Sequence, residues 1–209
     1  ERRALDRAAG SPAWEQVREL AFSAASLGPS SPVGYVFASA LVPVLQAVTA
    51  YAAPSFPAGG GILAGAADLM RRIRHEFRYD PKATAISTPL AEVFGKRHGV
   101  CQDFAHVMIA GLRGIGLPAA YVSGYIRTIP PPGQPRLQGA DATHAWVSVW
   151  CGDDLGWVGF DPTNDLMVAN DHIVLAMGRD FADVSPVDGV IVGSRQQKLR
   201  VEVDVMPVE

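Results

Sequence analysis

A long stretch without charged residues is the feature that most constrains how this chain can fold. From Leu20 to Ala67 there is no Asp, Glu, Lys or Arg, and a run of that length first suggests a membrane span. Prolines and three consecutive glycines interrupt it, and its longest unbroken piece, Val44 to Ala53, is too short to cross a bilayer. We therefore expect no contact with a membrane. Val44 to Ala53 is predicted to be a helix that packs on the domain's own core or that another molecule covers.

Length and composition point to one globular domain outside the nucleic-acid-binding class. The chain has 209 residues, of which 48% are hydrophobic and 19% charged, and its net charge is −3. A weakly acidic chain lacks the basic field that nucleic acids require. The two cysteines, Cys101 and Cys151, form no disulfide framework, and the first residues are too charged for a signal peptide. We expect both thiols to be free and the protein to be cytoplasmic.

Helical patterns come first along the chain and strand patterns follow. Helices are predicted over residues 12–20, 44–53, 62–77, 88–95 and 101–115, and strands over 119–127, 143–150, 157–163, 172–178, 187–192 and 199–205. Residues 128–142 are predicted to be a stiff, proline-rich loop. This order predicts an α+β fold in which N-terminal helices pack on an antiparallel β-sheet.

Cys101 lies at the start of the last predicted helix. Phe104, Val107, Met108 and Leu112 recur at three- and four-residue steps after it, which indicates a buried helix. The unpaired N–H groups and the positive end of the helix dipole favour a thiolate at such a position. A lone cysteine in a hydrophobic segment is, however, about as often a small buried side chain.

Two further residues lie downstream in an order that suits nucleophilic catalysis. His144 begins one predicted strand, and Asp161 ends the next strand, where Pro162 prevents the ladder from continuing. Cysteine, histidine and aspartate can act as nucleophile, base and the group that orients the base. Taken singly, His144 is more simply explained as a core or surface histidine, and Asp161 as a turn residue.

These residues lie in segments that resemble a known family. The segments are Gly99-Val100-Cys101-Gln102-Asp103-Phe104-Ala105-His106, Thr143-His144-Ala145-Trp146-Val147 and Gly156-Trp157-Val158-Gly159-Phe160-Asp161-Pro162-Thr163-Asn164. They are similar to the three signature blocks of the transglutaminase-like superfamily, and most similar to its bacterial cysteine protease type. Phe77-Arg78-Tyr79-Asp80 and residues 178–186 match as well. The resemblance covers roughly residues 33–205.

The resemblance implies a papain-like fold, an activity and a domain organisation. It makes Cys101 the nucleophile, His144 the base and Asp161 the orienting group of a cysteine-dependent amide hydrolase or acyltransferase that forms a thioester on a peptide or protein substrate. Residues 1–32 would be an extension or linker from a missing domain, and residues 33–209 the catalytic domain. Relatives usually carry an N-terminal β-rich domain, so contact with such a domain and a homodimer are both expected possibilities.

Three further residues are weaker candidates for the site, each with a simpler explanation. Tyr79 could be the second oxyanion donor or a packing aromatic. Gln102 follows the cysteine rather than preceding it, so the role of papain's glutamine is not transferred to it. Trp146 could wall the acyl-binding slot or pack in the core. No histidine pair has metal-ligand spacing and no loop suggests calcium, so no metal or cofactor is predicted. The alternative function is a binding or assembly module that keeps the fold without turnover.

Overall fold

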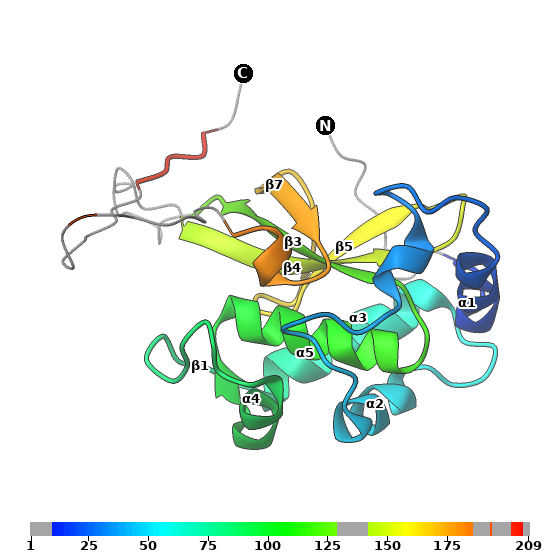
Figure 1. The fold of residues 1–209 in the computed structure, drawn as a ribbon, viewed down its shortest axis with the longest axis horizontal. Coiled ribbons are helices and arrows are strands. Elements are labelled where there is room, and N and C mark those ends of the chain that lie inside the picture. The colour runs from blue at the N-terminus through cyan, green and yellow to red at the C-terminus, as the bar shows by residue number, and fades with distance from the viewer. Residues whose placement is uncertain (1–9, 129–141, 186–192, 194–201, 207–209) are drawn as a thin grey trace.

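An antiparallel sheet with helices against one face is the framework of the molecule (Figure 1). The computed structural model describes residues 10–128, 142–185, 193 and 202–206. The sheet has the strand order β6-β5-β4-β3-β7. Its strands are β3 (Ala119–Ile126), β4 (Ala142–Trp150), β5 (Trp157–Asp161), β6 (Leu166–Met167) and β7 (His172–Gly178). The predicted α+β, papain-like fold is confirmed.

The helices precede the sheet in the chain, as predicted. They are α1 (Trp14–Phe22), α2 (Gln46–Ala52), α3 (Ile62–Glu76), α4 (Leu90–Lys96) and α5 (Cys101–Gly114). Short 3₁₀ helices η1 (Pro32–Tyr35), η2 (Ala53–Ser55) and η3 (Phe181–Asp183) lie between larger elements. A two-stranded parallel pair, β1 (Arg78–Tyr79) with β2 (His98–Gly99), was not predicted. None of the helices in the described ranges is long and apolar enough to cross a membrane.

Three predicted segments between and after these elements need separate comment. The strand predicted over 187–192 lies outside the described residues, as does nearly all of the loop predicted over 128–142. The strand predicted over 199–205 is wrong for its described part, because residues 202–205 form neither helix nor strand. Alternating apolar residues set which face a side chain takes, but they do not provide a neighbouring strand to pair with.

Helix α5 is the element against which the others pack. Phe104, Met108 and Leu112 of α5 are fully or almost fully buried. Alternate residues of the central strands β3 and β4, among them Tyr121 and Val147, belong to the same core cluster. Helix α5 runs beneath the sheet (Figure 1), and Cys101 is its first residue.

The core of the domain covers part of the charge-free run. Val48 and Ala52 of α2 are fully buried in the core. The buried guanidinium of Arg113 donates hydrogen bonds to the carbonyls of Tyr35, Ala119 and Arg179, which ties the run to α5 and the sheet. Burial lowers the pKa of Arg113 to about 10, so it stays charged at neutral pH. The run therefore contributes residues to the core, while other residues of the run are exposed.

Two predictions about this half of the chain stay predictions. Val44 is 54% exposed, so self-association through residues 33–56 has an exposed apolar position from which to start. The division at residue 32 is likewise untested, and α1 on its N-terminal side contributes Val17 and Ala21 to the core. The indole of Trp14 also donates to the carbonyl of Pro57, so α1 is attached to the segment that precedes α3.

The close approach of α2 to α5 yields a stability prediction. A Cβ at Gly111 would lie 2.8 Å from Cβ of Ala52, so Gly111→Ala must force the helices apart. We expect a loss of about 1–3 kcal/mol in the free energy of unfolding, measured by denaturant titration. Gly95→Ala in α4 is the matched control, because nothing lies within 4 Å of its Cβ position and it should gain about 0.5–1 kcal/mol. Equal changes in both variants would contradict the packing argument.

Candidate active site

Cys101 is the first residue of α5, where the helix backbone still has unpaired donors. The first hydrogen bond of the helix runs from the N–H of Phe104 to the carbonyl of Val100, at 3.1 Å. The N–H groups of Cys101, Gln102 and Asp103 therefore precede the intrahelical ladder. Asp103 accepts a hydrogen bond from the N–H of Val100 at 2.8 Å and another from Thr84 at 2.6 Å. Asp103 is thus a carboxylate at the start of the helix, and it anchors the turn before Cys101.

A glycine makes this turn possible. A Cβ at Gly99 would lie 2.5 Å from the carboxylate of Asp103 and 2.8 Å from its Cβ, so any larger residue would displace the cap. Gly99 also pairs with Tyr79 through the short β1–β2 ladder. The backbone on both sides of Cys101 is thus fixed by the cap and by this ladder.

His144 and Asp161 come together from neighbouring strands. The register of β4 with β5 pairs Val147 with Phe160, which places Asp161 diagonally across from His144. The Nε2 atom of His144 lies 2.8 Å from Oδ2 of Asp161. Cys101 is the other group near the ring, because it also contributes to the raised pKa of His144. Since Asp161 engages Nε2, Nδ1 is the ring nitrogen left for the thiol.

The carboxylate of Asp161 is fully buried and surrounded by donors. Its Oδ1 accepts from the backbone N–H groups of Thr163 and Asn164, at 2.9 and 3.2 Å. Its Oδ2 accepts from the side chain of Asn164 at 2.8 Å and lies 3.2 Å from Nε2 of His172. Pro162 ends the strand, and the turn that follows brings the two backbone donors back to the carboxylate.

These hydrogen bonds determine the charges of the pair. Burial would raise the pKa of Asp161, but the hydrogen bonds from His144, His172 and Asn164 hold it well below its usual range. Burial would lower the pKa of His144, whereas hydrogen bonds and the charges of Asp161 and Cys101 raise it to about 9. The geometry therefore favours an ionised carboxylate beside an imidazolium, with the thiol on the other side of the ring.

Comparison with known proteins identifies the family to which this region belongs. The family model described as "Transglutaminase-like superfamily" matches residues 57–162, which include Cys101, His144 and Asp161. The chain belongs to the transglutaminase-like superfamily. The resemblance stated from the sequence motifs is thus confirmed.

Three similar proteins illustrate the range of this superfamily. The uncharacterized protein Rv2569c of Mycobacterium tuberculosis is 49% identical over 170 residues, which cover 79% of this chain and 54% of that protein. A protein-glutamine gamma-glutamyltransferase of Pseudomonas aeruginosa is 37% identical over 101 residues, 46% of this chain and 15% of that protein. The crystal structure of a "putative cysteine protease" from Cytophaga hutchinsonii has a TM-score of 0.62 and 26% identity, and the match covers 76% of this chain and 50% of that one. The chain spans about half the length of the curated relatives that it matches at 49% identity.

The weaker candidates of this transglutaminase-like chain lie around the site in different ways. Tyr79 is 51% exposed and packs edge-on against Phe104, and its pKa is raised by burial and by the nearby charge of Cys101. The side-chain amide of Gln102 donates a hydrogen bond to the backbone carbonyl of Ile86 at 3.4 Å. Trp146 is buried, with its ring centroid 6.1 Å from that of His144. Any catalytic part for these three stays a prediction.

Sequence reasoning missed two residues that contact Asp161. Asn164 lies within a matched block and His172 begins a predicted strand, but neither residue was given a role in the site. Residues 168–171 connect β6 to β7 across the other three strands, and His172 lies at the end of that crossing. Only the crossing brings His172 to Asp161, so the sequence held no local signal for the contact.

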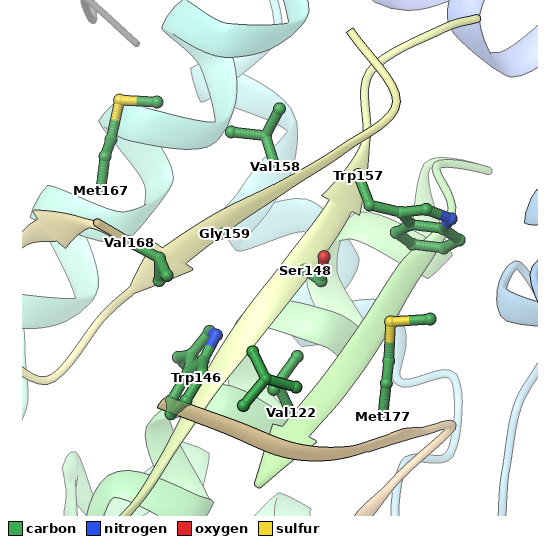
Figure 2. Close-up of a pocket in the computed structure, with 10 residues that line it drawn as sticks. Val122, Trp146, Ser148, Trp157, Val158, Gly159, Met167, Val168 and Met177 are labelled. Atoms are coloured by element: carbon green, nitrogen blue, oxygen red, sulfur yellow. The ribbon is translucent and has the colours of Figure 1, made fainter. Parts of the chain in front are cut away.

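The outer face of the sheet carries a pocket beside these histidines. The pocket is about 490 Å³ and is lined mainly by apolar side chains, among them Val122, Trp146, Trp157, Met167 and Met177 (Figure 2). Ser148 is its main polar side chain. Trp146 forms part of this wall and also contacts His144 and His172. The pocket lining does not include Cys101, so this pocket is separate from the predicted centre of Cys101, His144 and Asp161.

His144, Asp161 and His172 also bring three possible metal ligands together. Their donor atoms all lie within 4.8 Å of one another. Both imidazoles reach the same oxygen of Asp161 through Nε2, at hydrogen-bond distances of 2.8 and 3.2 Å. Protons between these atoms account for the arrangement without an ion. That the protein uses neither metal nor cofactor stays a prediction.

The raised pKa of His144 can be tested directly. The folded state favours the imidazolium, so this interaction stabilises the fold fully below the ordinary pKa near 6.5 and is lost as the pH rises through about 9. Asp161→Asn removes the opposite charge, and the titration midpoint of His144 should fall by more than about one pH unit. NMR of the imidazole nitrogens between pH 5 and 10 measures this midpoint. An unchanged midpoint would contradict the assigned ion pair.

Proposed function

We propose that this chain is a cysteine-dependent enzyme that cleaves amide bonds of peptides or proteins through a thioester on Cys101. The observation that carries the proposal is the environment of His144, whose Nε2 lies 2.8 Å from Asp161 and whose pKa the neighbouring Cys101 helps to raise. This is the arrangement that an activated nucleophile, its base and an orienting carboxylate require. Membership of the transglutaminase-like superfamily supports the same reaction class.

Each of the three groups has its own task in the proposed reaction. The Cys101 thiolate attacks the amide carbonyl carbon, and the backbone N–H of Cys101 is available to the oxyanion. The His144 imidazolium donates its proton to the leaving amine, the C–N bond breaks, and a thioester remains. Neutral His144 then takes a proton from water, which attacks the thioester and releases the acid and the thiol. Asp161 keeps the ring oriented throughout.

Hydrolysis is our first choice over transfer to an amine. Cys101 is partly exposed, so water has access to a thioester formed there. Transfer requires that water be excluded while an amine enters. The relative named as a protein-glutamine gamma-glutamyltransferase supports glutamine side-chain amides as the first substrates to test in either reaction. The cytoplasmic location expected from the free cysteines belongs to the proposal and stays untested.

The test follows the acyl-enzyme by mass spectrometry. The parent protein is mixed with a blocked glutamine-containing peptide, with and without an added primary amine, and stopped in acid within seconds. We expect a thioester adduct on Cys101. Without the added amine, water should hydrolyse this adduct to the carboxylic acid of the peptide. Cys101→Ala should abolish the adduct and lower turnover by about 10⁶-fold, whereas Asp161→Asn should cost less because it removes no reactant.

Cys151→Ala is the matched control for this test. Cys151 is fully buried, its thiol donates to the carbonyl of Val149, and burial raises its pKa to about 12, so it should not react. Iodoacetamide should therefore label Cys101 much faster than Cys151. Equal labelling of the two, or turnover that persists in Cys101→Ala, would overturn the proposal. A folded protein with a reactive Cys101 but no turnover on any amide would favour the non-catalytic module.

A further inference from the structure

The carboxylate of Asp161 is held by two histidines rather than one. Its Oδ2 lies 2.8 Å from Nε2 of His144 and 3.2 Å from Nε2 of His172. The two imidazole centroids are 6.2 Å apart, so the rings flank the same oxygen. The reaction proposed above uses His144 and leaves His172 without a task.

The contact with Asp161 orients the His172 ring. A carboxylate can only accept, so Nε2 of His172 must carry the hydrogen. Its Nδ1 is buried and has no hydrogen-bond partner among the described residues. The side chain is only 2% exposed. A buried imidazole with one nitrogen unpaired costs free energy, and the hydrogen bond to Asp161 is the described polar contact of the ring that offsets it.

Packing prevents the His172 ring from turning away. Trp146 meets it edge to face, with ring centroids 5.2 Å apart, and the same indole lies 6.1 Å from the ring of His144. Gly124 of β3 makes room for this indole, because a Cβ there would lie 2.5 Å from the Trp146 ring. The Trp146 indole therefore contacts both imidazoles on the Asp161 side of the sheet.

We propose that His172 is a positioning residue that acts through Asp161: its Nε2–H restrains Oδ2 so that the carboxylate keeps His144 turned toward Cys101. The inference rests on the proposed function of the three-residue centre. His172 touches no reacting atom, and its effect passes through the carboxylate alone. Removing its donor should therefore change the reactivity of Cys101 only while Asp161 is a carboxylate.

A pair of matched variants separates this role from simple packing. In His172→Gln the amide nitrogen can occupy the place of Nε2 and still donate to Asp161. In His172→Asn the amide lies near the place of Nδ1, which is unpaired in the structure. The readout is the rate at which iodoacetamide alkylates Cys101, measured from pH 5 to 9, which needs no substrate. We expect His172→Gln to stay within about threefold of the parent and His172→Asn to lose about 10- to 100-fold.

The same variants in an Asp161→Asn background complete the test. There His172→Gln and His172→Asn should react at equal rates, because the group through which they act is gone. His106→Phe is the control, since His106 is another buried histidine, which accepts from the N–H of Phe181 and does not touch Asp161. Its effect should be the same in both backgrounds. If His172→Asn does not fold, His172→Phe keeps a ring and removes the donor, and it should show the same loss.

The outcomes distinguish two failures. If His172→Gln and His172→Asn behave alike, or if their difference persists in Asp161→Asn, His172 only fills space and the inference is wrong. If Cys101 of the parent reacts no faster than Cys151 and His144→Ala changes nothing, the proposed function fails first. Fast labelling of Cys101 that depends on His144, with no dependence on His172, would overturn the inference and leave the proposed function in place.

Discussion

The buried carboxylate of Asp161 is the interaction on which the candidate active site depends. A carboxylate without solvent exposure is stable only when donors surround it. Five hydrogen bonds from a turn, an asparagine and two histidines provide this. The hydrogen bonds of Asp161 to His144 and His172 therefore link the end of β5 to β4 and to the start of β7 at one end of the sheet. The same interaction raises the pKa of His144. The buried carboxylate therefore also favours the imidazolium that the proposed reaction uses.

Helix α5 connects this cluster to the rest of the molecule. Its buried face supports the sheet that carries His144 and Asp161, and its first residue is the cysteine. A shift of the helix would therefore move the thiol relative to the imidazole. Asp103 and Gly99 hold the start of the helix, while Arg113 near its end ties it to the charge-free segment before α2. The contacts that pack α5 in the core therefore also fix the position of Cys101.

Sequence periodicity predicted the longer helices and strands, but it did not predict which strands pair with one another. The apolar steps after Cys101 predicted α5, and the alternation around His144 predicted β4, because burial against one face leaves such patterns in the residues. The short ladder at Tyr79 and the strand β6 were missed, since two-residue strands are too short to show a period. Residues 202–205 alternate as a strand does but have no strand structure, because pairing depends on a neighbour.

The sequence by itself determined the family, the α+β order and three reactive residue types whose spacing suits a cysteine enzyme. It could do so because the motifs are local and each lies at an element end. Tertiary structure alone decided that Asp161 is shared by two histidines and which residues of the charge-free run are buried. Those contacts join segments that are separated in the chain by strand crossings and helix packing, and such distances leave no periodic trace in the residues.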